Sequence, residues 1–396
     1  MHDPSNHPFI LHSHSTRPGS LLLTGYTTPL SSLPISTRAR ILHGWRTSML
    51  APLQGLFKSL NALGKVMFIR TSTPFYHLTG FPQAPPSWSP AASYPYEFLT
   101  FPLPDPSAAR NRNPPVQIEV DIVIVGSGCG AGVAAHRLAH ALPPGTRILV
   151  VEKGRHFDNS HFPMSQREGL ANLFESGGII ETDDGSMTVT AGACFGGGGT
   201  INWSASLQTQ HFVRREWADD RNLPFFESPA YQACLDRVCH VMDVSADSIV
   251  QNHGNRVLLE GARQLGYDAK PVPQNCGRES EHHDGYCTLG CHKGDKKGPV
   301  AGWFPEAARR GVKFVQGMKV DRVVWTEQGL KKGKKVAGGV RGTWSPLGLG
   351  GPEVKVVIKA KKVVVSCGTL WSPVVLLNSG LKVRVTFIDS GMKMAD

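Results

Sequence analysis

The sequence predicts an α/β fold in which a Rossmann-like nucleotide-binding domain holds a parallel sheet with helices on its faces. Three observations predict it. A run of β-branched residues from Val120 to Val125 leads into a glycine cluster, a helix-compatible segment follows at 133–142, and a second β-branched run at 147–151 ends on Glu152. A strand, a helix and a strand in this order form a βαβ unit. We expect the rest of the chain to be organised around it.

The turn after the first strand contains the pattern Gly-x-Gly-x-x-Ala, formed by Gly126, Gly128 and Ala131. Gly126 permits the tight turn, Gly128 lets the backbone approach a pyrophosphate, and Ala131 is small where helix packs on strand. The positive end of the helix favours phosphate, and Glu152 is placed to accept hydrogen bonds from ribose hydroxyls. Glycines alone are also compatible with a plain tight turn. The flanking strand, helix and acid favour a dinucleotide site.

The bulk composition is that of a globular protein. With 396 residues, 40% of them hydrophobic, the chain is expected to form two or three domains of ~150 residues each. The net charge of +11 points to an acidic partner. The lysine runs at 331–335 and 359–362, however, are better explained as a solvated hairpin or edge strand. Nucleic acid is not expected as a partner. The eight cysteines are expected to be reduced thiols, since no secretory leader precedes them.

The first 115 residues differ in composition from the rest. Residues 1–36 are rich in His, Ser, Thr and Pro, which predicts disorder. Residues 37–115 form a helical and Pro-rich extension, in which apolar residues recur at helical spacing from Ala39 to Arg70 and Pro52 is expected to break or kink the helix. Basic residues among them favour either a helix lying on a membrane surface or a helical pair packed on the main body. After Gly80 the prolines predict an extended connector, wrapped on the surface or loosely ordered. No apolar run reaches the ~20 residues of a membrane span.

A second glycine cluster follows the βαβ unit, with four consecutive glycines at 196–199. Glycine at each position costs ~1 kcal/mol of chain entropy relative to alanine. Its neighbours Phe195, Ile201 and Trp203 are core-type residues, which argues against a flexible linker. We therefore expect a flat, rigid group to come close to this backbone.

With these motifs the sequence resembles the glucose-methanol-choline (GMC) oxidoreductases, a family that binds FAD. Residues 126–132, Glu152 and residues 192–203 match the N-terminal signatures, and residues 363–380 look like the second signature. The long-chain fatty alcohol oxidase branch is the most similar, and the segments that resemble it are residues 202–205, 214–217, 259–267 and 285–297.

The resemblance implies a set of cofactor-binding residues. Gly126, Gly128 and Ala131 would hold the FAD pyrophosphate, and Glu152 the adenosine ribose. The backbone of Val320 would meet the adenine. The second cluster would pass under the isoalloxazine and pyrophosphate, with Asn202 hydrogen bonding near the reactive ring, and the chain would return to the flavin at its C-terminal end. The residues implied at these two places are Gly196, Gly197, Gly198, Gly199, Thr200 and Asn202, and Gly368 and Thr369.

The resemblance also implies a reaction. Long-chain primary alcohols would be oxidised to aldehydes, with hydride transfer to flavin N5 and reduction of O2 to H2O2. The alternatives are a dehydrogenase with another electron acceptor, and a truncated or non-catalytic flavin-binding protein. The family's catalytic histidine lies well beyond its second signature, whereas the last histidine here is His292. The catalytic residues are therefore unknown, and the chain is expected to be C-terminally truncated. An intracellular location is expected, with association to the peroxisomal or endoplasmic-reticulum membrane as one form of it.

The FAD-binding domain is predicted at 116–381, with residues 203–310 as a mostly helical insertion, the substrate domain largely missing and residues 382–396 as an unmatched tail. Its strands are expected at residues 120–125, 147–151, near 313–325, and 363–366.

A loop within the insertion is rich in potential metal ligands: Cys276, Cys287, Cys291, His282, His283 and His292. Thiolate and imidazole bind zinc, and thiolates bind iron–sulfur clusters. The loop has no second Cys-x-x-Cys pair, which favours a substrate-pocket or structural loop, and no metal is predicted.

Overall fold

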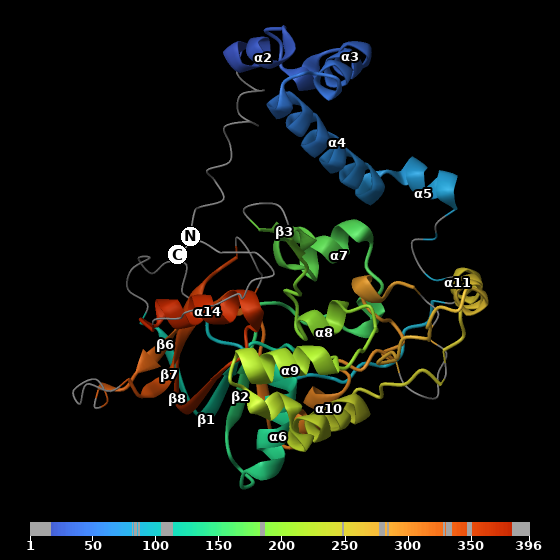
Figure 1. Ribbon diagram of the computed structural model, residues 1–396. Coiled ribbons are helices and arrows are strands. Elements are labelled where there is room, and N and C mark those ends of the chain that lie inside the picture. The colour runs from blue at the N-terminus through green and yellow to red at the C-terminus, as the bar shows by residue number, and fades with distance from the viewer. Residues whose placement is uncertain are drawn as a thin grey trace. The chain divides into compact units, whose positions relative to one another are not determined.

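The computed structural model describes residues 17–80, 82, 85, 88–103, 114–182, 187–247, 249–276, 282, 285–327, 329, 335–346 and 351–381. The chain divides into two compact units, Met1–Pro82 and Gln83–Asp396 (Figure 1). The lysine run at 331–334, His283 and the unmatched tail at 382–396 lie outside the described residues.

The first unit is helical. The prediction of disorder for residues 1–36 is wrong from Arg17 onward. Trp45 is buried and its Nε1 donates to the Leu23 carbonyl at 2.9 Å, which holds residues 17–24 against the helix that contains Trp45. Pro52 breaks the helical pattern as predicted and lies in the first turn of the next helix, where its missing N–H costs nothing. The elements of this unit are α2 (Arg17–Thr24), η2 (Leu30–Ser32), α3 (Ile35–Arg46), α4 (Ala51–Thr71) and α5 (Thr73–Thr79).

The connector at 88–103 belongs to the second unit, so the predicted extension 37–115 spans two units. Phe98 bridges to Phe314 in parallel, and the Leu99 N–H donates to the Phe314 carbonyl at 2.8 Å. The Tyr96 hydroxyl donates to the Val300 carbonyl at 2.6 Å. Because its aromatic side chains are anchored in this way, the connector runs along the sheet edge and is not loosely ordered.

The second unit is built on a six-stranded sheet, which confirms the predicted α/β class. The strand order is β5-β2-β1-β8-β7-β6. The first four strands are parallel neighbours, whereas β7 runs antiparallel to both β8 and β6. The strands are β1 (Val116–Val125), β2 (Ile148–Val151), β5 (Lys313–Val315), β6 (Met318–Trp325), β7 (Ala337–Trp344) and β8 (Val354–Val365), and a separate antiparallel pair consists of β3 (Ile180–Glu181) and β4 (Thr188–Val189).

Two details of the predicted sheet are wrong. The single strand expected near 313–325 is two strands at opposite edges, because the chain turns at Gly317, whose φ is +72°. Strand β7 was not predicted, since its glycines have low strand propensity. These glycines instead allow the backbones of the neighbouring strands to approach β7 closely. A Cβ at Gly339 would lie 1.9 Å from the Ile358 carbonyl oxygen, and one at Gly342 would lie 2.3 Å from the Lys319 carbonyl oxygen.

Alternate residues of the central strands pack into two separate hydrophobic cores, one on each face of the sheet. Val123 and Val125 belong to the core that includes Val375 of α14 (Gly368–Asn378), whereas Ile122 and Ile124 belong to the core on the opposite face. That second core is completed by α6 (Cys129–Ala141) and α12 (Trp303–Arg309). Figure 1 shows α14 and α6 on opposite sides of the strands. The two-sided burial explains why residues 122–125 of β1 and all of β2 are apolar.

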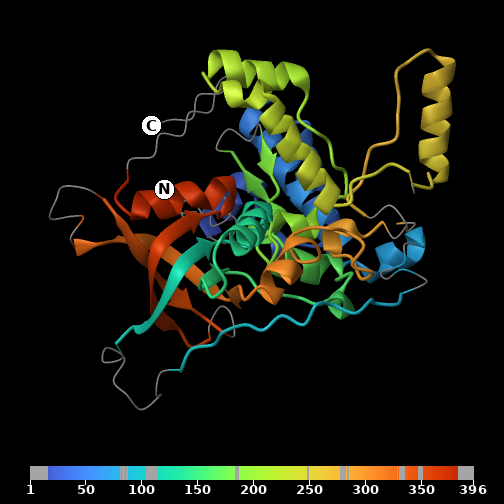
Figure 2. The same ribbon diagram turned by 90° about the horizontal axis from the view of Figure 1, so that it is seen from below.

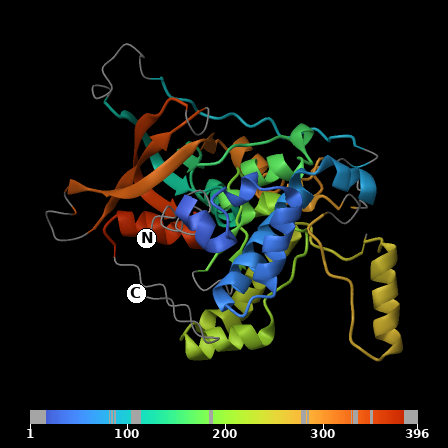
Figure 3. The same ribbon diagram turned by 90° about the horizontal axis from the view of Figure 1, so that it is seen from above.

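Helices are the main regular structure in the described part of residues 203–310. Helix α11 projects away from the rest of the second unit (Figures 2 and 3), and its Leu258 is 71% exposed. Within the described parts, no helix is both long and apolar enough to cross a membrane. The remaining elements are η3 (Asn159–His161), α7 (Gln166–Asn172), η4 (Glu175–Gly178), α8 (Gly198–Ile201), α9 (His211–Asp220), η5 (Pro224–Glu227), α10 (Pro229–Val241), α11 (His253–Gln264) and η6 (Cys287–Leu289).

The aromatic core beside β5 generates a stability prediction. Phe314 is 1% exposed and its ring lies 5.3–5.7 Å from those of Tyr96, Phe195 and Phe304. We expect Phe314→Ala to lower the free energy of unfolding by about 3–5 kcal/mol, because it removes buried surface and leaves a cavity. Urea denaturation followed by circular dichroism measures this. Phe212→Ala, at a phenylalanine that is 66% exposed, is the control, and equal effects of the two changes would contradict the prediction.

Candidate functional site

The first glycine turn lies where the carboxyl ends of the parallel strands meet. Gly126 follows β1 with a φ of +98°, and a Cβ there would lie 2.3 Å from the Ser366 carbonyl oxygen at the end of β8. Both the backbone conformation and the close approach require glycine. In open parallel sheets, ligands bind outside the carboxyl ends of the strands, where the strand order reverses. The order β2-β1-β8 places that point at Gly126.

Helix α6 starts immediately after this turn and is not capped by a side chain. Gly128 is its N-cap residue, and a Cβ there would meet nothing within 4 Å. The first N–H groups of an α-helix lack intrahelical partners and carry partial positive charge. Ala131 is fully buried in the core between α6 and the sheet. The geometry therefore offers open space and backbone donors at Gly128, and helix–strand packing at Ala131.

A buried hydrogen-bond network around Ser127 joins three distant segments. The Glu152 Oε2 atom accepts from the Ser127 N–H at 2.9 Å and from its Oγ at 2.7 Å, while Oε1 accepts from the Gly154 N–H at 2.8 Å. The Ser127 Oγ accepts in turn from the Gly196 N–H at 2.9 Å. Burial raises the pKa of Glu152, and these hydrogen bonds oppose the rise. A carboxylate has about four acceptor positions, and three are used here.

The second glycine cluster packs closely against the first turn, and most of its glycines leave no room for a side chain. A Cβ at Gly192 would lie 2.4 Å from the carbonyl carbon of Gly197, and one at Gly197 would lie 3.2 Å from Cα of Gly128. At Gly199, a Cβ would meet Pro299 at 2.3 Å. A Cβ at Gly198, in contrast, would meet nothing within 4 Å. The two clusters thus form one backbone surface, and both Gly128 and Gly198 leave space beside it.

Lys296 fixes the segment after the second cluster. Its ammonium group is buried and donates to the carbonyls of Thr200 at 2.6 Å, Asn202 at 2.9 Å and Cys287 at 2.5 Å. Burial lowers the pKa of Lys296, and neighbouring thiols oppose this. The Asn202 side chain is used locally, because Nδ2 donates to the Gly199 carbonyl and Oδ1 accepts from the Ser204 N–H.

The cysteine loop forms a small polar cluster beside Lys296. His282 Nε2 lies 2.9 Å from the Cys287 Sγ, and its Nδ1 lies 3.8 Å from an Asp295 oxygen. Asp295 and the neighbouring thiols raise the pKa of His282 to about 12. Burial raises the pKa of Cys287, but its hydrogen bonds with His282 and Ser204 outweigh this and lower it overall. The two shifts favour the protonated form of the His282 imidazole and the ionised form of the Cys287 thiol.

The remaining predicted residues lie on strands and helices that border the site. Val320 is buried in β6, and that strand begins at Met318, whose N–H donates to the Glu152 carbonyl at 2.8 Å. Gly368 and Thr369 begin α14, directly after the Ser366 contact with Gly126. All the predicted segments thus converge on the carboxyl ends of β1, β2 and β8.

Sequence reasoning missed two residues of this site. Ser127 and Lys296 are both buried, and each bridges separate segments. A signal existed for each, since Ser127 stands between the two fingerprint glycines and Lys296 lies in a short loop between Gly294 and Gly298. What each side chain contacts lies far away in the sequence.

A separate cavity of about 460 Å³ borders the second cluster. Its lining includes Tyr96, His156, Phe195, Thr200 and Lys296. Neither Gly126 nor Glu152 lines it, so it is distinct from the surface around Gly128. The His156 ring lies 5.1 Å from that of Tyr96 and 5.5 Å from that of Phe195. This burial lowers the pKa of His156 to about 4.

Comparison with known proteins gives consistent matches. A family model described as GMC oxidoreductase matches residues 170–388. The long-chain-alcohol oxidase FAO3 of Arabidopsis thaliana is 36% identical over 255 residues, which cover 64% of this chain and 33% of that protein. The long-chain-alcohol oxidase FAO1 of the same plant is 33% identical over 63% of this chain and 32% of its own length. The chain thus spans about a third of the length of these curated relatives.

Two solved structures that are similar to part of this chain were also found. A formate oxidase variant from Aspergillus oryzae RIB40 is 16% identical with a TM-score of 0.44, over 68% of this chain and 48% of that chain. Pyridoxine 4-oxidase from Mesorbium loti is 19% identical with a TM-score of 0.44, over 66% of this chain and 52% of that chain.

The environment of His156 generates a prediction about pH. Its pKa falls from 6.5 in the unfolded chain to about 4 in the fold, so the unfolded state binds the proton more readily. The stability that this difference provides is present above pH 6.5 and lost as the pH falls toward 4. We expect the protein to lose about 2 kcal/mol of unfolding free energy between pH 7 and pH 5 through this residue alone. In His156→Phe, which keeps a ring in the aromatic cluster, the loss over this range should be smaller by that amount. An identical pH dependence for the two proteins would contradict the assignment.

Proposed function

Because the matching family model covers more than half of the sequence, the chain belongs to the GMC oxidoreductase family, and we propose that it binds FAD for the oxidation of long-chain primary alcohols. The observation that carries the proposal is the backbone surface formed by the two glycine clusters at the start of α6. The similarity to long-chain-alcohol oxidases supports the substrate class.

The residues at this surface fit the pyrophosphate of FAD. The start of α6 has no side-chain cap, and both Gly128 and Gly198 border space that a Cβ would enter without contact. Uncapped N–H groups and the positive helix end bind phosphate. Gly126 and Gly197 hold the backbone in left-handed conformations, with φ of +98° and +53°, that only glycine adopts readily.

Each part of the surface has a separate role in the proposal. Gly128 and Gly198 would hold the pyrophosphate, and Glu152 would accept a ribose hydroxyl with its remaining acceptor position while Ser127 holds the carboxylate in place. Val320 would border the adenine. The segment from Thr200 to Asn202, held by Lys296, would lie beside the flavin ring, and Gly368 and Thr369 would close the site from the side of β8.

When bound, FAD would supply the redox chemistry: it would accept the hydride from the alcohol carbon at N5 and give two electrons to O2, which would form H2O2. The chain would position this group through the backbone of the two glycine clusters. The residue that takes the hydroxyl proton is unknown. The alternative function is that of a dehydrogenase that uses a different electron acceptor, and it shares every binding residue named above.

We also propose an intracellular location, with peripheral contact of α4 with a peroxisomal or endoplasmic-reticulum membrane.

The space beside Gly128 allows a selective test of FAD binding. We expect Gly128→Val to abolish the visible absorption of bound FAD, because the side chain fills the space that the pyrophosphate needs. The fold should persist, since Gly128 has a φ of −67°, which valine adopts, and its Cβ meets nothing within 4 Å. Circular dichroism checks the fold, and absorption after reconstitution with FAD checks binding.

Gly261→Ala is the matched control, because Gly261 lies in the middle of α11 and its Cβ would also meet nothing within 4 Å. It should bind FAD like the unaltered chain and gain slightly in stability. If Gly128→Val retains full FAD absorption, the pyrophosphate does not lie at this helix start and the assignment is wrong.

The reaction itself is tested by anaerobic addition of a long-chain primary alcohol to the FAD-loaded chain. Loss of the oxidised flavin absorption is the expected result, because hydride transfer reduces the flavin. Admitting O2 should restore the absorption and release H2O2. Reduction without peroxide, together with turnover of an artificial electron acceptor, would identify a dehydrogenase. A yellow protein that does not respond to alcohol would overturn catalysis by this chain and leave FAD binding as its function.

A further inference from the structure

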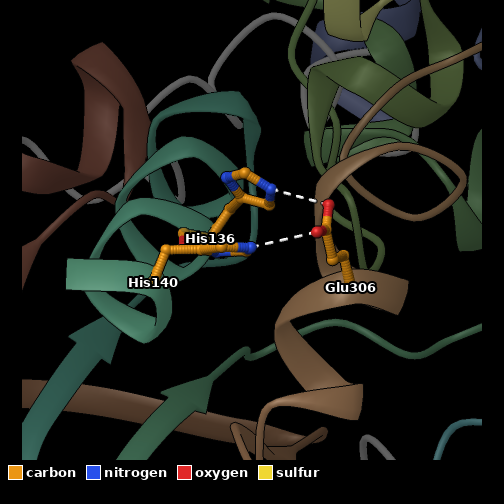
Figure 4. Close-up of side chains that lie close together, drawn as sticks. All are labelled: His136, His140 and Glu306. Carbon is orange, nitrogen blue, oxygen red and sulfur yellow. Dashed lines mark hydrogen bonds and ion pairs between the residues drawn. The ribbon is translucent and has the colours of Figure 1, made fainter. Parts of the chain in front are cut away.

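Two histidines of α6 converge on one glutamate of α12, on the outer side of the contact between these helices. His136 Nε2 lies 2.8 Å from Glu306 Oε2, and His140 Nε2 lies 3.0 Å from Glu306 Oε1 (Figure 4). The histidines are four residues apart, so they lie on the same face of the helix. The three ligand atoms all lie within 4.8 Å of one another.

The orientation of His140 shows that this arrangement needs a cation between His140 and Glu306. Its Nδ1 lies 2.7 Å from the His136 carbonyl oxygen, which can only accept, so Nδ1 carries a proton. In neutral His140 the Nε2 atom therefore carries a lone pair and no proton, and this lone pair faces a carboxylate oxygen of Glu306. Two acceptors at 3.0 Å repel unless a cation neutralises the contact. That cation is either a second proton on the ring or a metal ion between the two groups.

The geometry favours a metal ion. Metal-binding histidines usually donate their second ring N–H to a backbone carbonyl or a carboxylate, as His140 does here. Two histidines and a glutamate, with water in the fourth position, form a common zinc ligand set. Zinc bonds of ~2.0–2.1 Å place tetrahedral ligand atoms ~3.3 Å apart, so the two nitrogen–oxygen contacts of 2.8 Å and 3.0 Å need to lengthen by only a few tenths of an ångström. The side chains of His136, His140 and Glu306 are 17%, 25% and 50% exposed, which gives an ion access.

We propose that His136, His140 and Glu306 form a binding site for a divalent transition-metal ion, with zinc as its probe, that clamps α6 to α12. The proposal does not depend on FAD or on alcohol oxidation. Imidazole and carboxylate together suit zinc and its first-row neighbours better than calcium or magnesium.

The clamp joins the helix that begins at Gly128 to a short helix whose Trp303, Phe304 and Ala307 are buried. Gly132 of α6 already packs closely on this region, since a Cβ there would lie 3.1 Å from Pro299 and 3.3 Å from Trp303. A metal ion held by all three side chains binds the folded arrangement more tightly than the unfolded chain, so it stabilises the fold by mass action.

The test is titration of zinc into the EDTA-treated full chain, with the number of zinc ions bound and the melting temperature as readouts. Histidines 2, 7, 12 and 14 are replaced by alanine in every protein compared, so that they do not bind zinc. We expect His140→Ala and Glu306→Gln each to lose one bound zinc ion, with affinity at this site weakened by roughly 100-fold or more. Zinc at 100 times its Kd should raise the melting temperature of the unaltered site by roughly 5 °C and should leave both variants unchanged.

His161→Ala is the matched control, because His161 pairs with Asp158 at 3.0 Å but, among the described residues, does not belong to a group of three metal-ligating side chains. It should keep the zinc ion and the thermal shift. Glu306→Gln preserves the shape of the side chain, so its circular dichroism without zinc should match that of the parent chain. If the variants bind as many zinc ions as the parent, the zinc is held elsewhere, for instance by the thiols, and the proposal is overturned. It is also overturned if the parent binds no zinc, and a second proton on His140 then explains the geometry.

Discussion

The hydrogen bonds of Ser127 are the constraint on which the rest of the site depends. One hydroxyl donates to Glu152 and accepts from the Gly196 N–H, so it fixes the end of β2 and the second glycine cluster relative to the first turn. Because the group is wholly buried, neither bond can be exchanged for water, and an unpaired buried donor would cost about 1–3 kcal/mol. The close contacts between the two clusters require that this alignment be correct to within a few tenths of an ångström, since backbone meets backbone there.

The two buried charges of the site are stabilised in the same way. Glu152 is held by N–H and O–H donors, and Lys296 by three carbonyl oxygens. Neither depends on a single opposite charge. A buried ion pair would fix two side chains to each other. Glu152 and Lys296 instead each hold separate stretches of backbone together. Their hydrogen bonds to the backbone offset the free-energy cost of removing each side chain from water, and they make the loops rigid. The site is therefore ordered mainly through its main chain, which suits a ligand that is recognised by its phosphates.

The sequence predicted what is encoded locally. The βαβ unit, the break at Pro52 and the two glycine clusters follow from spacing and residue type, and the sheet class follows from them. The failures share a physical cause. Strand β7 contains glycines that local propensity counts against a strand, and only the neighbouring strands show why they are needed. The helix at Arg17 depends on Trp45, and the roles of Ser127 and Lys296 depend on partners far along the chain. The cluster of His136, His140 and Glu306 was missed for the same reason, because a helix contact brings together residues about 170 positions apart.

The strand order also determines when the central sheet can form during synthesis of the chain. β1 lies at the centre of the sheet, and its partner β8 follows more than 200 residues later. During synthesis at ~5–20 residues per second, one edge of β1 therefore stays unpaired for on the order of 10–50 s. An unpaired, β-branched strand edge is a template for association with other chains. Folding beside the ribosome cannot complete the central sheet until residues 354–365 have emerged, so the nascent chain is a natural client for chaperones that cover strand edges, and its yield in a foreign host should depend on them.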